Sequence, residues 1–231
     1  RELADGAFPQ EMARLAAQTA YIRASTGRYR EAAPAFRHLA PLMKTAGPPS
    51  LRAAYLNVAA GNLMFLAQWA DARDLLEQAR SLNKYYGFDF LTALLDDLDA
   101  QLCAAVGDPK ASALRRVAIA APSIRHDAYC LSLALTHAGT EDRRAKRAPA
   151  AEDWYRQAVR AADPRGSPYA FLNASANLAY TRADLSVDEA RERLAEIAVR
   201  ARDFDLLFVA LKAEYFAASL LYRDGRRDDA L

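Results

Sequence analysis

The 231-residue sequence has few of the residues that define several large classes of protein. Cysteine occurs only twice, as Cys103 and Cys130, which excludes a disulfide scaffold and indicates a reducing compartment. No run of about 18 uncharged apolar residues is present, so no membrane-spanning helix is expected. The opening residues, RELADGAFPQEM, have no apolar core of the kind that a signal peptide needs. These absences predict a cytoplasmic location and no membrane contact.

The sequence also lacks an excess of charge of either sign. Lys and Arg number 31 and Asp and Glu number 29, which leaves a formal net charge of +2. Such a balance gives no bulk attraction to nucleic acid or to an anionic membrane. The most concentrated charge is RRAKRAP, from Arg143 to Pro149, whose cations could contact phosphate. We interpret this run as a solvated loop between helices, and do not expect nucleic acid to bind through it.

Strand signals are nearly absent, because no segment sustains a two-residue alternation of β-branched residues. Alanine, leucine and arginine, which favour helices, are abundant. Glycine occurs 9 times and proline 10 times, mostly in clusters that end helices and begin turns. The clusters are Gly27, Gly47-Pro48-Pro49, Gly87, Gly107-Asp108-Pro109, Pro122, Pro164-Arg165-Gly166 and Gly225. The sequence therefore predicts an all-α fold.

The segments that follow these junctions resemble one another. GRYREAAPAFRHL starts at Gly27, AQWADARDLLEQA at Ala67 and GDPKASALRRVAI at Gly107, so the starts are 40 residues apart (67 − 27 and 107 − 67). GRRDDAL starts at Gly225, and the interval holds two further copies, in APAAEDWYRQAVRAADP and LSVDEARERLAEI. A period of this length predicts a solenoid of stacked units. The predicted units span residues 11–49, 50–87, 88–122, 123–165 and 166–202, with a truncated unit at 203–231.

Each predicted unit makes physical sense as a helical hairpin. A small residue at the seam lets the second helix approach the first closely, as at Ala32, Ala72, Ala190 and Ala230. A larger residue four positions after the small one packs against the next hairpin. These larger residues are Phe36, Leu76, Tyr155 and Leu194. Ser186 and Glu189 have the spacing of a capping box.

Two predicted units depart from this pattern. The third has Pro109 and Ser112 at seam positions, and the fourth has an extended connection at about residues 139–149. We expect both to be irregular hairpins.

The seam pattern resembles that of the tetratricopeptide repeats, whose second helix follows Gly-x-aromatic-x-x-Ala-x-x-x-aromatic. Gly27, Tyr29, Ala32 and Phe36 match this pattern closely. A second match, with a shifted first position, consists of Ala67, Trp69, Ala72, Leu76 and Ala79. LNVAAGNLMF and ASANLAYTRA are similar to the first helix of the repeat. The long unit is similar to the repeats of MalT-type bacterial transcription regulators and to the sensory arrays of bacterial diguanylate cyclases and histidine kinases.

The resemblance, which covers essentially the whole chain, implies a right-handed α-solenoid of five to six antiparallel hairpins. In this family the first helices line a concave groove, where peptides usually bind. The residues of this sequence that map to the groove are Tyr21, Asn57, Phe65, Asp97, Gln101, Asn173, Asn177, Tyr180, Lys212 and Tyr215. Asparagine amides can hold an extended peptide backbone, and tyrosines offer contact area at low entropic cost. Alternatively, some of these side chains pack between helices or face water without binding a partner.

Signs of catalysis or metal binding are missing. His38, His126 and His137 are not spaced as metal ligands, and we expect the two cysteines to pack as small apolar residues. The sequence has no Gly-x-Ser-x-Gly motif, no Cys-His signature and no glycine-rich phosphate loop. Acidic pairs such as Asp96-Asp97 and Asp228-Asp229 are interpreted as surface residues. We therefore expect no enzyme activity within this chain, no cofactor and no metal.

Three functional hypotheses follow. The first is a regulatory module of a bacterial signalling or transcription regulator, which binds a protein, peptide or small effector and shifts an attached output domain. The second is an interaction scaffold that does not switch. The third is the regulatory segment of an enzyme, such as a diguanylate cyclase, whose catalytic domain lies outside this chain. The end at RDDAL, where a second helix should begin, predicts a fragment and makes a homodimer through exposed end faces a candidate.

Overall fold

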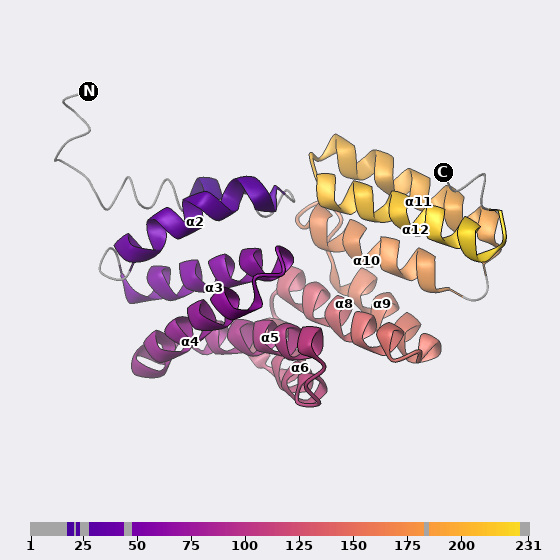
Figure 1. Cartoon of the computed structure of the whole chain (residues 1–231). Coiled ribbons are helices and arrows are strands. Elements are labelled where there is room, and N and C mark those ends of the chain that lie inside the picture. Colours follow the sequence, from indigo (N-terminus) through magenta and orange to yellow (C-terminus); the bar gives the residue numbers. More distant parts are fainter. Residues whose placement is uncertain (1–17, 21, 24–27, 44–47, 183–184, 227–231) are drawn as a thin grey trace, which may run out of the picture. The chain divides into compact units, whose positions relative to one another are not determined.

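The computed structural model describes residues 18–20, 22–23, 28–43, 48–182 and 185–226. Every regular element in these ranges is helical, as Figure 1 shows, and none of the described helices is long and apolar enough to cross a membrane. The chain divides into two compact units, Arg1–Leu114 and Arg115–Leu231, which we call the N-terminal and C-terminal units. The division falls inside helix α6, within the third predicted repeat. The expectation of one continuous array stays a prediction.

The helices follow the predicted seams. Those that begin in the N-terminal unit are α2 (Tyr29–Met43), α3 (Pro49–Phe65), α4 (Trp69–Tyr86), α5 (Asp89–Val106) and α6 (Ala111–Ala120). Those of the C-terminal unit are α7 (Pro122–Arg125), α8 (Ala128–Arg144), α9 (Ala148–Ala161), α10 (Pro168–Thr181), α11 (Val187–Asp203) and α12 (Leu207–Arg223). The most extensive packing joins α3 to α4, α8 to α9 and α11 to α12. First helices also pack on the first helix of the next hairpin: α3 on α5, α8 on α10 and α10 on α12.

Small seam residues lie inside this packing, as predicted. Ala32, Ala72 and Ala190 are buried, which allows close approach of the helix backbones. The larger residues of the pattern are buried as well, namely Phe36, Leu76, Tyr155 and Leu194. Ala230 and the predicted end face lie outside the described residues.

A buried tyrosine joins α3 to α2 in the N-terminal unit. The ring of Tyr55 lies 5.6 Å from that of Phe36, centroid to centroid, and its hydroxyl donates to the Phe36 carbonyl at 2.6 Å. Burial raises the pKa of the Tyr55 hydroxyl above its usual value, so it stays a proton donor. This pair sets how closely α3 packs against α2.

Local capping also follows the sequence. The Ser186 side chain accepts a hydrogen bond from the backbone N–H of Glu189, whose carboxylate accepts one from the Ser186 backbone N–H at 2.9 Å. This is the predicted capping box, and it begins α11. The pKa of Glu189 is lowered because its carboxylate accepts hydrogen bonds from the backbone N–H of Ser186 and, at 2.8 Å, from the Ser186 hydroxyl.

The hairpin turns share one backbone geometry. Ala67, Gly107 and Lys146 have φ of 57°, 78° and 61°, so all three are left-handed. The residue after each of them donates its N–H five positions back, as Gln68 does to Leu63, Asp108 to Cys103 and Arg147 to Asp142. The turns recur at intervals of 40 and 39 residues (107 − 67 and 146 − 107), which matches the predicted repeat.

One expectation about the fourth unit is wrong. Residues 139–149 do not form an extended connection, because α8 continues to Arg144 and α9 begins at Ala148. Gly139 does not break α8; it is buried inside the helix beneath the ring of Tyr155. The basic run is therefore a loop only in part: Arg143 lies in the last turn of α8 and Pro149 in the first turn of α9, while Lys146 and Arg147 lie in the exposed turn between the two helices. The third unit is irregular as predicted, with the 10-residue α6 followed by the 4-residue α7.

Candidate functional site

Five of the ten residues expected to line the groove lie on two packed helices of the C-terminal unit. Asn173, Asn177 and Tyr180 lie on α10, and Lys212 and Tyr215 lie on α12, which packs directly against α10. Both helices are first helices of their hairpins, as the sequence pattern predicted. Side chains of α8, which packs on the other side of α10, complete the group.

Lys212 is the central cation of this group. The residue is half-buried overall, but its ammonium group lies among protein atoms: Nζ donates to Oδ1 of Asn173 at 2.9 Å and lies 5.4 Å from the Phe216 ring centroid. Burial, and then the positive charges of Arg143 and Arg144, lower the pKa of Lys212 to about 7. In the described part of the chain no carboxylate forms an ion pair with Lys212. Among the described residues, its positive charge is stabilised by an amide oxygen and a ring face.

Two stacked rings lie beside Lys212. The rings of Tyr180 and Phe216 are 4.2 Å apart, centroid to centroid, with 15° between their planes. The Arg143 Cζ lies 5.4 Å from the Tyr180 centroid and 5.6 Å from that of Phe216. Arg223 lies 6.0 Å from Tyr180. Guanidinium groups at these distances are attracted to the ring faces. We call Arg143, Tyr180, Lys212, Phe216 and Arg223 the cationic–aromatic cluster.

Two asparagines support the cluster in different ways. Asn173 is buried and accepts from Lys212, so its amide oxygen faces the ammonium group. Asn177 is fully buried, and its Nδ2 donates to the backbone oxygen of Asn173 at 2.8 Å. The Oδ1 of Asn177 is buried without a hydrogen-bond partner among the described residues. Asn177 therefore packs between helices, while Tyr215, which is 68% exposed, lies at the edge of the cluster.

The other expected residues lie in the N-terminal unit or outside the described ranges. Asn57 is half-buried on α3, and Phe65 ends that helix. Asp97 and Gln101 lie one turn apart on α5, and Gln101 donates to Asp97 at 3.0 Å. Tyr21 lies outside the described residues. Whether any of the ten residues binds a partner stays a prediction.

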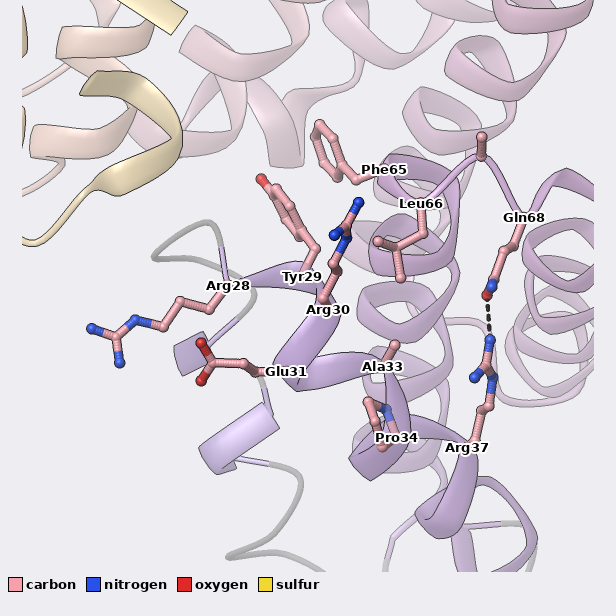
Figure 2. Close-up of a pocket in the computed structure, with 11 residues that line it drawn as sticks. Arg28, Tyr29, Arg30, Glu31, Ala33, Pro34, Arg37, Phe65, Leu66 and Gln68 are labelled. Atoms are coloured by element: carbon pink, nitrogen blue, oxygen red, sulfur yellow. Dashed lines mark hydrogen bonds between the residues drawn. The ribbon is translucent and has the colours of Figure 1, made fainter. Parts of the chain in front are cut away.

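A cavity of about 750 Å³ lies where α2 begins and α3 ends, as Figure 2 shows. Phe65 is the one expected residue that lines it, and its ring stacks on that of Tyr29 with the centroids 4.4 Å apart. Three arginines, Arg28, Arg30 and Arg37, also line the cavity. Aromatic faces and guanidinium groups are thus combined in the N-terminal unit too.

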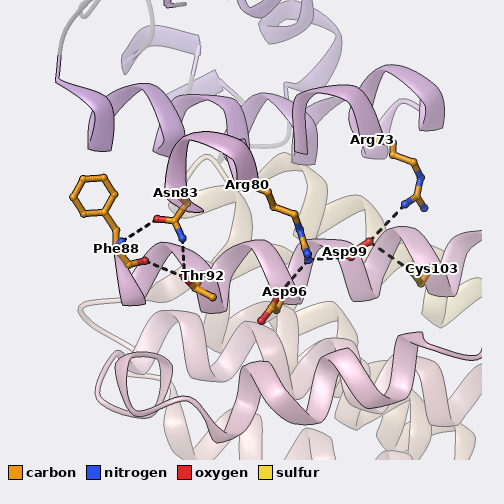
Figure 3. A network of polar contacts seen from close by, with 8 residues as sticks. All are labelled: Arg73, Arg80, Asn83, Phe88, Thr92, Asp96, Asp99 and Cys103. Atoms are coloured by element: carbon orange, nitrogen blue, oxygen red, sulfur yellow. Dashed lines mark hydrogen bonds and ion pairs between the residues drawn. The ribbon is translucent and has the colours of Figure 1, made fainter. Parts of the chain in front are cut away.

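Acidic residues meet arginines between α4 and α5, as Figure 3 shows. Arg80 donates to Asp96 at 3.0 Å and to Asp99 at 2.9 Å. Burial raises the pKa of Asp96, and Arg80 opposes that rise. This network joins α4 to α5.

The two cysteines lie on α5 and α8. Cys103 is buried next to Asp99, and burial, followed by the negative charge of Asp99, raises the pKa of its thiol. Its expected role in packing is confirmed, while Cys130 is half-buried on α8. In the described part of the chain no three His, Cys, Asp or Glu side chains are arranged to hold a metal ion.

Sequence reasoning missed three residues of the cationic–aromatic cluster. Phe216 follows Lys212 by four positions on α12, so helical spacing alone would have placed it on the same face. Arg143 was missed because its segment was interpreted as a loop, whereas α8 extends through it. Arg223 lies in the last turn of α12, where only the packing on α10 brings it to Tyr180.

Comparisons with known proteins bear on the fold. No protein-family model and no curated protein sequence matches the chain. Among solved structures the chain is similar to a Signal Transduction ATPase with Numerous Domains (STAND) protein with a tetratricopeptide repeat sensor from Pyrococcus horikoshii, with a TM-score of 0.62 and 13% sequence identity. The match covers 96% of this chain and 35% of that chain, so this chain spans about a third of that protein. The fold is therefore an all-α array of tetratricopeptide-like hairpins, as predicted.

Proposed function

We propose that this chain is a binding module without catalysis of its own, and that the cationic–aromatic cluster holds an acidic segment of a protein or peptide partner. The observation that carries the proposal is the state of Lys212. Its ammonium group is withdrawn from water and held by Asn173, and no described carboxylate pairs with it. A buried cation without a counter-ion is costly, and an anionic ligand would offset that cost.

The rest of the cluster suits a segment that is both acidic and apolar. Arg143 and Arg223 add positive charge near the Tyr180 ring. The half-buried ring of Tyr180, which stacks on the buried Phe216, and the exposed ring of Tyr215 offer apolar contact area. Charge complementarity of this kind speeds association and selects the partner, while buried aromatic anchors supply affinity.

We further propose that binding here is regulatory. The support is the solved structure just described, whose tetratricopeptide array is named a sensor within a signal transduction ATPase. In such an arrangement the occupied array shifts an attached output domain, as in a signalling or transcription regulator. A scaffold that binds the same segment without switching is the alternative, and it differs only in the response of the output domain.

The peptide test uses the whole chain and two labelled decapeptides of alternating residues, one of Glu and Leu and one of Gln and Leu. We expect fluorescence anisotropy to show binding of the Glu peptide, weaker at 300 mM salt than at 50 mM, and at least tenfold weaker binding of the Gln peptide. Lys212→Met and Arg143→Met should each weaken binding of the Glu peptide at least tenfold.

Arg160→Met is the matched control, because it removes the same charge from an exposed position of α9 outside the cluster. It should change binding of the Glu peptide less than threefold. The proposal would be contradicted if the Glu peptide did not bind, or if Arg160→Met weakened its binding as much as Lys212→Met and Arg143→Met do.

A further inference from the structure

The N-terminal unit holds a cavity that the proposed peptide site does not use. Its volume, about 750 Å³, falls within the range of about 300–1,000 Å³ that is usual for small-molecule sites. The walls come from the first turns of α2 and from the end of α3 with the turn that follows it. The left-handed Ala67 (φ 57°) and the hydrogen bond from Gln68 N–H to Leu63 hold that turn in place.

One wall is a pair of stacked rings. Tyr29 and Phe65 are 4.4 Å apart with 12° between their planes, and Phe65 remains 46% exposed. The Asn62 side chain donates to the Tyr29 backbone oxygen at 3.3 Å, which ties the start of α2 to α3 beneath the stack. An anchored stack with exposed ring surface is a platform on which a further flat ring can lie.

The remaining walls are mainly cationic. Arg28, Arg30 and Arg37 line the cavity, against one carboxylate, that of Glu31. Figure 2 shows the Arg30 side chain extending alongside the Tyr29 ring toward Phe65. Arg30 pairs with no carboxylate in the described part of the chain. The cavity also borders the first turn of the 15-residue α2, whose helix dipole adds to the positive potential.

A further arginine is held in position on the opposite side. The Nη2 of Arg37 donates to Oε1 of Gln68 at 2.7 Å, a bond that joins α2 to the turn after α3 (Figure 2). Because this bond uses only one of the five N–H groups of a guanidinium, others remain for a ligand. A rigid guanidinium fork suits a carboxylate or a phosphate.

We infer that this cavity binds a small planar anion, namely an aromatic or heteroaromatic ring that carries a carboxylate or phosphate group. The ring lies on the Tyr29–Phe65 stack, and the anionic group meets Arg30 and Arg37. The inference does not depend on the peptide site, because it uses residues of the N-terminal unit alone.

Five probes separate the contributions of ring and charge. Adenosine monophosphate and 2-naphthoate have both features, adenosine and 2-naphthol have the ring alone, and inorganic phosphate has the charge alone. We expect isothermal titration of the whole chain to show binding of at least one of the first two probes, and at least tenfold weaker binding of the other three. Binding of the nucleotide alone would identify a phosphate-bearing ligand, and binding of 2-naphthoate alone a carboxylate.

Variants locate the site. Arg30→Met and Phe65→Leu should each weaken binding of the probe at least tenfold. Lys84 is an exposed cation of α4 outside the cavity, so Lys84→Met should change the affinity for the probe less than threefold. Phe65→Leu keeps an apolar side chain but removes the stack, and a circular dichroism spectrum unchanged from wild type would show that the fold persists.

Several results would overturn the inference. The first is that no probe binds, and the second is that the neutral and anionic rings bind equally well. The third is that Lys84→Met weakens binding of the probe as much as Arg30→Met and Phe65→Leu do. Lys212→Met should not change binding of these probes. Because the peptide proposal is tested by the Glu peptide and the variants of α8 and α12, either proposal can fail while the other stands.

Discussion

At the scale of single residues, two glycines inside helices have opposite surroundings. A Cβ on Gly139 of α8 would lie 2.6 Å from the Tyr155 ring, which is fully buried. A Cβ on Gly61 of α3 would meet its nearest neighbour, Leu98 Cδ1, at 4.0 Å, an ordinary contact. The first position requires the absence of a side chain, and the second tolerates one.

We expect Gly139→Ala to destabilise the C-terminal unit by about 1–3 kcal/mol, since the buried ring must move and overpacking outweighs the gain in helix propensity. Gly61→Ala, the matched control, should stabilise the N-terminal unit by about 0.5–1 kcal/mol, because it makes the same change where there is space. Urea unfolding followed by circular dichroism measures both. A stabilising Gly139→Ala would show that Tyr155 does not pack over α8.

Lys212 makes stability depend on pH. Its native pKa is about 7, against 10.5 for a free lysine, so between these values the unfolded chain binds the additional proton. The free energy of unfolding therefore rises with pH across this window, and the cost of the buried charge is present in full below pH 7. Arg143 and Arg144 add to this cost.

We expect Lys212→Met to be more stable than the wild type at pH 6 and to lack the rise between pH 7 and 10. Free energies of unfolding at five pH values test this, and the difference between the two proteins removes the contribution of other groups. A difference that stays constant from pH 6 to 10 would show that the Lys212 pKa is not lowered.

At the scale of elements, the hairpin turns hold a small amount of strain. The turn between α8 and α9 places Lys146 at φ 61°, where a Cβ is crowded, while the preceding Ala145 has φ −77°. The equivalent turn between α5 and α6 has Gly107 at φ 78°, which has no such cost.

We expect Lys146→Gly to stabilise the C-terminal unit by about 0.5–1 kcal/mol, because relief of strain exceeds the entropy that glycine adds to the unfolded chain. Ala145→Gly should instead destabilise it by a similar amount, since it adds the same entropy and relieves nothing. Thermal unfolding measures the stability of both variants relative to the wild type. Destabilisation of equal size in the two would mean that the left-handed turn costs nothing.

At the scale of the whole molecule, each compact unit has its own reporter and its own buried clusters. The chain has 2 tryptophans, of which Trp69 lies on α4 of the N-terminal unit and Trp154 on α9 of the C-terminal unit. Leu76 belongs to the buried cluster of the first unit and Leu194 to that of the second. In arrays of repeats, stability is a sum of local terms, so such clusters can unfold separately.

We expect Leu76→Ala to lower the free energy of unfolding of the N-terminal unit by about 2–5 kcal/mol, and therefore to lower the unfolding midpoint that Trp69 reports. The midpoint that Trp154 reports should stay nearly unchanged. Leu194→Ala should do the reverse. Trp154→Phe and Trp69→Phe backgrounds isolate each signal in urea titrations. Equal shifts of both signals in either variant would show that the chain unfolds as one cooperative unit.

The sequence by itself determined the fold class and most of the repeat. Seam residues such as Ala32, Phe36 and Leu76 are recognisable because packing of hairpins requires a small and a large residue at fixed spacing. The capping box at Ser186 was predictable for a similar reason, since its partners lie three residues apart. Patterns of this kind depend on short-range geometry, which the order of residues contains directly.

Only the tertiary structure decided which side chains meet. Lys212 and Asn173 are 39 residues apart, and their hydrogen bond exists because α12 packs on α10. An extended connection was expected from about residue 139, but α8 continues past Gly139, which lies against the ring of Tyr155, and this continuation brings Arg143 into the cluster. Burial, ring stacking and the lowered pKa of Lys212 arise from neighbours distant in sequence, which no local pattern specifies.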